Sequence, residues 1–375
     1  MKNPTLQLRL EDQLARLVAM PTISEDIGIC SVAIKGLATE LAEMGLHITL
    51  GGEKHSWLVA TTQKTKHPKV MLVAHLDVVP PSTDDHFEMK ATDTKLFGRG
   101  VYDMKFALAC YLELLHSYGD TKDDYDIGLM ITTDEELGGH HGTQEALSDG
   151  WSCDIAVLPD GGRDWEIEAK AKGMLIISVA ATGKSSHGSR PWEGENAFLK
   201  LLPALNEISI KYPSENPLGL TASINVVQSG AAQNQLPERA EAQLDIRAFD
   251  PQDTLACKAF LVDLARRHDL EYTELAAAPP VTLQQEHPLV QKFITSVERT
   301  TNKPAKLTYS FGSSDARYFN ERNIPTVLVT PHGGGSHGAD EWIMRDELTL
   351  YYELLEHYVA SVARVRKTAK TSVVK

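Results

Sequence analysis

Residues 70–79 read VMLVAHLDVV, an apolar run broken only by a histidine and an aspartate near its end. Runs of this kind are typical of strands that are buried on both faces of a parallel sheet. Two more short apolar runs follow, 127–132 (IGLMIT) and 154–159 (DIAVLP), and a helical pattern at 104–117 separates the first run from the second. This alternation predicts an α/β fold with a mostly parallel sheet and flanking helices.

The α/β pattern is interrupted and then resumes. Helical spacing returns at 288–301 and from about 347, with an apolar strand at 324–330 between them. The intervening sequence instead predicts the order β-α-β-β-α-β, a ferredoxin-like α+β arrangement, and its proline-containing exit at 276–288 is typical of a linker. We therefore expect a discontinuous larger domain with a smaller domain inserted in it. The expected ranges are 1–171 with 287–375 for the larger domain and 172–286 for the inserted domain.

Composition and charge narrow the possible partners. The formal net charge of −14 argues against nucleic-acid binding, which needs clustered Lys and Arg. No run of 18 apolar residues and no signal-peptide core occurs, so neither membrane insertion nor secretion is expected. The four cysteines form no C-x-x-C pair, which argues against a disulfide framework and a thiolate zinc site and favours the cytoplasm.

Histidine and carboxylate residues follow several of the predicted strands. His75 and Asp77 end the first strand, where alternation predicts that they share a face and that Asp77 supports the imidazole. Taken singly, each acid has a structural explanation, such as an N-cap for Asp103 or a turn for Asp160. Taken together, they cluster where α/β sheets bind ligands, outside the carboxyl ends of the strands. The full candidate set is His75, Asp77, Asp103, Glu135, Glu136, Asp160 and His337.

This inventory of imidazoles and carboxylates without thiolates suits Zn²⁺ and tolerates Mn²⁺ or Co²⁺. A single divalent ion would leave Asp103, Glu136 and Asp160 with excess negative charge, so two metals are expected. A two-metal site polarises a scissile carbonyl and activates water. Glu135 is next to a ligand but is not needed as one, and it can act as the general base.

Five segments resemble the M20 metallopeptidase family, in family order and with approximate family spacing. They are HLDVVP (75–80), GRGVYDMK (98–105), TTDEELGG (132–139), PDGG (159–162) and HGADEW (337–342). The family includes acetylornithine deacetylase, succinyl-diaminopimelate desuccinylase, carboxypeptidase G2 and several di- and tripeptidases. The resemblance spans nearly the whole chain. It implies that Asp103 bridges two metals, that His75 and Asp160 complete one site and that Glu136 and His337 complete the other.

The resemblance also assigns a role to the inserted domain, as a lid and dimerisation module of a homodimer. His187, in GKSSHG (183–188), matches a histidine that steadies the oxyanion, often from the partner subunit, although it could also cap a turn. Asn234 and Arg247 match positions that contact the substrate's carboxylate, although Arg247 could also be a solvated surface residue. Gly312 and Ser313 resemble a loop that lines the substrate pocket.

Two features bear on the substrate. Phe106 stands where family members usually have glycine, so the packing or the pocket beside that helix is expected to differ. The third carboxylate is Asp160, where deacetylases and desuccinylases of the family tend to carry Glu and peptidases tend to carry Asp. The expected substrate is therefore a small peptide or an N-acyl amino acid, with a leaning toward a dipeptidase or an aminoacylase.

Two other hypotheses of function compete with a two-metal hydrolase. Residues 334–338 fit the G-x-S-x-G pattern of serine hydrolases, with Ser336 as nucleophile. However, too little chain follows to supply the acid and then the histidine that such an enzyme needs. The second hypothesis is a non-catalytic metal-binding homologue, because fold alone does not establish function.

Overall fold

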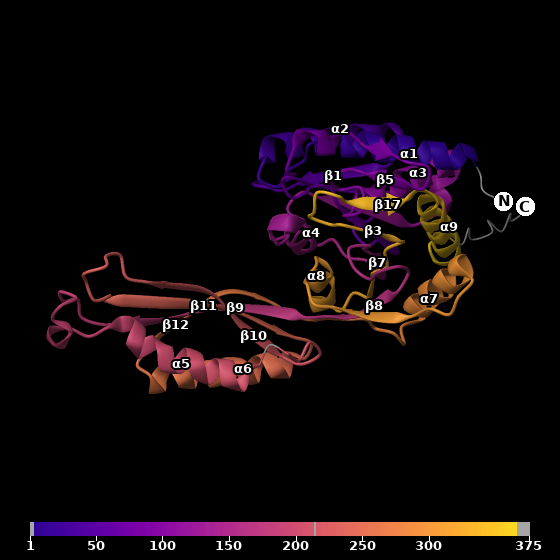
Figure 1. Cartoon of the computed structure of the whole chain (residues 1–375). Helices are drawn as coiled ribbons and strands as arrows, with labels where there is room; N and C mark the ends of the chain where they lie inside the picture. The colour runs from indigo at the N-terminus through magenta and orange to yellow at the C-terminus, as the bar shows by residue number, and fades with distance from the viewer. Residues whose placement is uncertain (1–3, 214, 366–375) are drawn as a thin grey trace, which may run out of the picture. The chain divides into compact units, whose positions relative to one another are not determined.

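The computed structural model describes residues 4–213 and 215–365, and the chain divides into two compact units. Unit 1 holds the residues up to 169, residues 283–309 and the residues from 314 onward. Unit 2 holds residues 170–282 and the short segment 310–313. Each unit has its own sheet and its own helices (Figure 1).

A six-stranded sheet forms the centre of unit 1. Four of its strands, β6, β3, β7 and β15, are mutually parallel, while β1 and β2 add an antiparallel edge. This confirms the predicted α/β fold with a mostly parallel sheet, although the sequence did not predict the two edge strands. In sheet order the strands are β1 (His47–Gly51), β2 (Trp57–Thr61), β6 (Ile127–Thr132), β3 (Val70–His75), β7 (Ile155–Val157) and β15 (Thr326–Val327).

All six residues of β3 and all six of β6 are buried, as expected for strands covered on both faces. Helix α3 packs on β3, α2 packs on β1 and β2, and α1 packs against α3 and α9 (Figure 1). Asp26 caps α2 by accepting a hydrogen bond from the Ile29 amide. The helices of unit 1 are α1 (Pro4–Val18), α2 (Ile27–Glu43), α3 (Lys105–Tyr118), α4 (Thr143–Ser148), α7 (Pro288–Thr301), α8 (Ala316–Glu321) and α9 (Arg345–Val362).

Two smaller sheets were not predicted. One is antiparallel and consists of β16 (Gly333–Gly334), β17 (Trp342–Met344), β5 (Lys95–Phe97) and β4 (Lys90–Ala91). The other consists of β13 (Val281–Thr282), β8 (Ile167–Ala171) and β14 (Leu307–Ser310). The stretch 276–288, which was expected to be a linker, therefore contains a paired strand, β13.

Unit 2 has the predicted β-α-β-β-α-β order. Its antiparallel sheet runs β10-β11-β9-β12, so the first and third strands lie in the centre, which confirms the ferredoxin-like prediction. Helices α5 and α6 pack on the sheet, and Leu201, Leu205, Leu261 and Leu264 join its core. The elements are β9 (Gly173–Thr182), α5 (Ala197–Lys211), β10 (Thr221–Ser229), β11 (Arg239–Ala248), α6 (Pro251–Arg267) and β12 (Glu271–Ala278).

No helix within the described ranges is both long and apolar enough to cross a membrane.

Candidate metal centre

His75 is the last residue of β3 and is 1% exposed. Its Nδ1 lies 3.0 Å from the backbone carbonyl oxygen of Asp77, and because a carbonyl only accepts, Nδ1 carries the proton. The Asp77 carboxylate, which was expected to be the partner, is farther away, with Oδ1 at 3.6 Å. With Nδ1 held by the main chain of Asp77, Nε2 is the ring nitrogen that faces Asp103 and that would bind a metal once it gives up its proton.

The Asp77 carboxylate instead holds the turn that carries Glu135 and Glu136. It accepts hydrogen bonds from the Glu135 amide (3.3 Å) and the Glu136 amide (3.2 Å), and from the Ser24 hydroxyl (2.8 Å). Complete burial raises the pKa of Asp77 to about 6, although His75, the Ser24 hydroxyl and the Glu136 amide oppose the rise. Asp77 therefore connects the end of β3 to the turn that follows β6.

Asp103 precedes α3 and lies between two imidazoles. Its Oδ1 is 3.2 Å from Nε2 of His75, and its Oδ2 is 3.3 Å from Nε2 of His337. Burial opposes ionisation, but hydrogen bonds from His337 and His75 hold the pKa of Asp103 below its usual range. Each carboxylate oxygen thus faces a different imidazole, which is the arrangement that a bridging ligand requires.

Glu341 fixes the loop that presents Asp103. This carboxylate accepts hydrogen bonds from the amides of Gly100 (2.8 Å), Tyr102 (2.9 Å) and Asp103 (2.9 Å). It also pairs with the buried Arg99 guanidinium at 2.9 Å. Sequence reasoning quoted the segment that contains Glu341 but gave this residue no role, because its partners lie more than 200 positions earlier in the chain.

His337 reaches the site from the turn between β16 and β17. It was expected to follow the strand at 324–330, but β15 is only two residues long and a separate hairpin carries the histidine. Its φ of 64° lies in the left-handed region, and its side chain is 55% exposed. Hydrogen bonds from its Nε2 to Asp103 and to Glu136, which lies 3.0 Å away, raise the pKa of His337 to about 10.

Glu135 and Asp160 complete the cluster. Asp160 follows β7, and Glu135 begins a 3₁₀ turn after β6. Burial raises the pKa of both carboxyls well above their usual values. The charge of Asp160 raises the pKa of Glu135 further, and the charge of Asp103 does the same for Asp160. Negative charge is therefore concentrated here beyond what the protein groups neutralise.

The ligand atoms form two compact groups, each within 4.8 Å: His75 with Glu135 and Asp160, and Asp103 with Glu136 and His337. Because Asp103 also lies beside His75, it connects the two groups. Imidazole nitrogens and carboxylate oxygens are suitable ligands for zinc and similar divalent ions. The residues present therefore fit two divalent cations, which would also compensate the clustered carboxylates.

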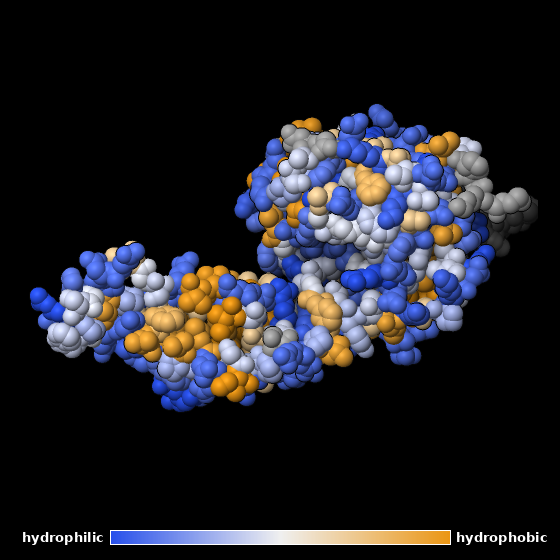
Figure 2. Space-filling view, viewed as in Figure 1, coloured by the Kyte–Doolittle hydropathy of each residue, from blue (hydrophilic) through white to orange (hydrophobic). Residues whose placement is uncertain are grey.

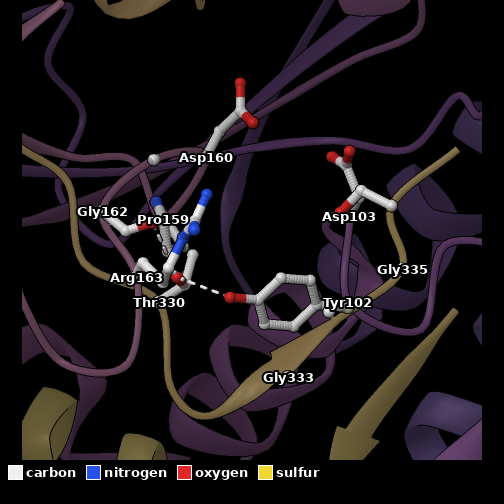
Figure 3. A pocket seen from close by; sticks show the side chains of 12 residues that line it. Tyr102, Asp103, Pro159, Asp160, Gly162, Arg163, Thr330, Gly333 and Gly335 are labelled. Carbon is white, nitrogen blue, oxygen red and sulfur yellow. Dashed lines mark hydrogen bonds between the residues drawn. The ribbon is translucent and has the colours of Figure 1, made fainter. Parts of the chain in front are cut away.

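A cavity of about 500 Å³ opens beside Asp103 and Asp160. Figure 3 shows the Tyr102 hydroxyl hydrogen-bonded to Thr330 at its edge. Ser336 also lines this cavity, but it lies in the β16–β17 hairpin, whereas a nucleophile elbow is a turn from a strand into a helix. The structural context of a serine nucleophile is therefore missing at Ser336.

Phe106, the departure from the family pattern, is fully buried on α3. It stacks with Tyr102 at 6.1 Å between ring centroids and makes an edge contact with Tyr351 at 5.1 Å. Phe106 therefore supports Tyr102, a residue of the cavity wall.

The remaining candidate residues lie in unit 2. His187 is exposed, and its Nδ1 is 2.8 Å from the Ser189 hydroxyl. The backbone carbonyl of Asn234 accepts a hydrogen bond from the Gly188 amide. Arg247 is held in a two-point ion pair by Asp245, at 2.6 and 3.1 Å. Gly312 and Ser313 belong to the short segment 310–313.

A model of peptidase family M20/M25/M40 matches residues 71–361, a span that contains all five candidate metal ligands. The chain belongs to this family. Its membership confirms the M20 resemblance and the expectation of an enzyme that hydrolyses amide bonds.

Individual M20 relatives align with most of the chain. It is 28% identical over 350 residues to a succinyl-diaminopimelate desuccinylase from Corynebacterium glutamicum, with 87% of this chain and 91% of that protein covered. A tripeptidase from Staphylococcus aureus has a TM-score of 0.79 at 22% identity, covering 94% and 97%. A dinuclear metal-binding peptidase of the M20 family from Bacillus subtilis has a TM-score of 0.71 at 16% identity, covering 96% and 99%. At these identities, the two solved structures show that the M20 fold is shared.

Proposed function

We propose that this M20 enzyme hydrolyses a dipeptide or an N-acyl amino acid with two divalent metal ions, for which zinc is the first choice and Co²⁺ or Mn²⁺ could substitute. The observation that carries the proposal is the position of Asp103, with one carboxylate oxygen beside His75 and the other beside His337. In this arrangement His75 and Asp160 would complete one metal site. Glu136 and His337 would complete the other.

When bound, two divalent cations would supply the Lewis acid that polarises the scissile carbonyl and makes water a better acid near neutral pH. The protein's own groups perform the remaining tasks. Glu135 takes the proton that the attacking water loses, and Asp77 holds the Glu135 backbone in place through its amide. The buried surroundings of Glu135 favour proton uptake by its carboxylate.

Roles in substrate binding follow from the family resemblance. Arg247 and Asn234 bind the α-carboxylate of the substrate's amine half, and Gly312 and Ser313 line the pocket. A guanidinium fork matches a carboxylate, and the existing pair with Asp245 orients that fork. His187 steadies the oxyanion, either within its own chain or from a partner subunit.

Dimerisation through unit 2 is also part of the proposal. Apolar side chains gather on one face of this unit (Figure 2). On α5, Leu199 is 62% and Ile210 is 72% exposed, and on α6 Leu255 is 57% exposed. Such a surface suits a protein partner, here a second copy of the chain. The reducing cytoplasm is the proposed compartment, because all four cysteines are buried and unpaired.

Elemental analysis followed by a screen of dipeptides and N-acyl amino acids, with and without chelator, tests the reaction. Glu135→Gln is expected to retain two metals per chain while losing about 10²- to 10⁴-fold in turnover. Glu88→Gln, at an exposed position of the same unit, is the matched control and is expected to keep wild-type turnover. Activity that survives chelation, or unchanged turnover in Glu135→Gln, would overturn the mechanism.

A further inference from the structure

The cavity beside the metal centre has a wall made largely of glycine. Gly161, Gly162 and Gly333 to Gly335 line it, and packing excludes larger residues at several of these positions. A Cβ on Gly333 would lie 2.2 Å from the Tyr102 ring, and one on Gly161 would lie 2.5 Å from the Glu168 carboxylate. With so few side chains present, the few charged or polar groups that remain determine what the cavity accepts.

The hydroxyl groups of Tyr102 and Thr330 on this wall are already engaged. Tyr102 bonds to Thr330 at 2.8 Å, and the Thr330 hydroxyl donates to the Gly162 carbonyl at 3.2 Å. The Tyr102 hydroxyl also lies 3.3 Å from the Pro331 carbonyl. Because both protons have acceptors within the protein, this pair offers a ligand little hydrogen-bond donation.

Arg163 is the cation of this cavity. Figure 3 shows it with Tyr102 and Thr330, below the carboxylates of Asp103 and Asp160 in that view. Arg163 is exposed and lines the same cavity as Tyr102 and Thr330. No group in the described part of the chain hydrogen-bonds to this guanidinium or forms an ion pair with it.

Asp164 and Glu166, which are close to Arg163 in sequence, and Glu347, which is bonded to Trp165, have other partners. The Asp164 carboxylate pairs with His332, Glu166 lies 4.0 Å from Lys306, and Glu347 accepts from the Trp165 indole at 2.5 Å. Asp103 and Asp160 share the cavity with Arg163, but in the proposed function they are metal ligands. A fork of five N–H donors therefore remains available to a ligand.

We infer that Arg163 binds a carboxylate on the acyl half of the substrate, so that this enzyme prefers acyl groups with an acidic end. The inference rests on the proposed function, which already assigns the α-carboxylate of the amine half to Arg247. The carboxylate at Arg163 is thus a second one, carried by a dicarboxylic acyl group or by an N-terminal Asp or Glu side chain. A planar guanidinium pairs with such a group through two parallel hydrogen bonds.

Matched substrates that differ only in this charge test the inference. The pairs are Glu-Ala with Gln-Ala, Asp-Ala with Asn-Ala, and N-succinyl-alanine with its neutral succinamoyl analogue. The metal-loaded enzyme is expected to cleave the acidic member of at least one pair with the higher kcat/KM. Arg163→Gln is expected to lower that value by about 10- to 100-fold and to change the value for the neutral member by less than about 2-fold. Whether the acyl-amino-acid pair or a dipeptide pair responds shows which source of carboxylate fits.

Two further variants keep the test decisive. Arg163→Lys keeps the charge but loses the fork, so it is expected to retain part of the preference for the acidic member. Arg299→Gln removes an equivalent exposed charge on α7 and is expected to leave the preference unchanged. Calorimetric titration of the metal-loaded protein with succinate and with butyrate gives a readout that needs no turnover, and Arg163→Gln is expected to abolish the difference between them.

The possible failures are distinguishable. If both members of every pair are cleaved equally well, and Arg163→Gln changes neither, the inference is wrong while the proposed function stands. If the metal-loaded enzyme cleaves no member of any pair and binds succinate no better than butyrate, the inference is wrong as well. Failure of the metal-loaded enzyme on the broader screen of dipeptides and N-acyl amino acids would count against the proposed function itself.

Discussion

Glu341→Gln tests how the loop before α3 is held. The side chain of Glu341 is 2% exposed, and each of its oxygens accepts two hydrogen bonds. Oε1 accepts from the amides of Tyr102 and Asp103, and Oε2 accepts from the Gly100 amide and the Arg99 guanidinium. Glutamine keeps the shape of the side chain but replaces one carboxylate oxygen with an NH₂ group. That group would donate where two other donors already point at it in a buried site.

The cost follows from this geometry. Breaking a buried ion pair by changing one partner typically costs about 3 to 5 kcal/mol, and the variant also loses hydrogen bonds to backbone amides. The free energy of unfolding is therefore expected to fall by about 3 to 5 kcal/mol. Because the same loop positions Asp103, metal affinity is expected to weaken by about 10- to 100-fold, as when outer-sphere partners of a metal site are lost.

Urea unfolding of the metal-free protein measures the first effect, and calorimetric titration with zinc measures the second. Glu40→Gln is the matched control, because Glu40 pairs with Arg16 at 2.7 Å on the surface, where both side chains are partly exposed. That control is expected to cost less than about 1 kcal/mol and to leave metal affinity unchanged. If Glu341→Gln behaved like Glu40→Gln in both assays, the assigned role of Glu341 would be refuted.

Three further predictions concern residues near the cavity. Ser336→Ala is expected to retain most of the hydrolytic activity of the metal-loaded enzyme, and loss of more than about 10²-fold would favour a serine nucleophile instead. Phe106→Ala is expected to lower the free energy of unfolding by about 3 to 5 kcal/mol, because it empties a fully buried site between Tyr102 and Tyr351; thermal unfolding measures the loss. Burial raises the pKa of Glu168 from 4.5 to about 7, so the folded protein keeps a proton that the unfolded chain releases, and stability falls by about 3 kcal/mol as the pH rises through that window. Glu168→Gln is expected to remove this fall, which urea unfolding at pH 5 and pH 8 measures. If the free energies of unfolding of the variant and of wild type differed by the same amount at both pH values, the assignment would be contradicted.

The sequence predicted the features that depend on local patterns of apolar and polar residues. Apolar runs located β3, β6 and β7, and the rule that ligands gather at the carboxyl ends of parallel strands was enough to group His75 with Asp160. The same reasoning placed His337 in the site but attributed its position to an α/β strand, whereas the β16–β17 hairpin carries it and the local pattern does not reveal that hairpin. The tertiary path of the hairpin, rather than any local signal, brings His337 to Asp103.

Contacts over long sequence separations account for what the sequence did not reveal. The role of Glu341 depends on a hairpin that packs against a loop about 240 residues earlier, and no periodicity encodes that packing. The edge strands β1 and β2 pair antiparallel to an otherwise parallel sheet, so the alternation of strands and helices does not predict them. Arg163 follows a Gly-Gly turn, and only the folded cavity shows that its charge has no partner among residues 4–213 and 215–365.

Asp77 shows why the site is built on two neighbouring strands. Its carbonyl accepts a hydrogen bond from Nδ1 of His75 at the end of β3, and its carboxylate accepts from the amides of Glu135 and Glu136 after β6. Since β3 and β6 are adjacent and parallel, with His75 paired to Thr132, one residue can reach both strand ends. A shift of register between these strands would move Glu135, the proposed base, and Glu136 together relative to His75. Sheet pairing, which is more rigid than a loop, thus sets the spacing between His75 and the turn of Glu135 and Glu136, and the proposed mechanism needs these groups to stay aligned.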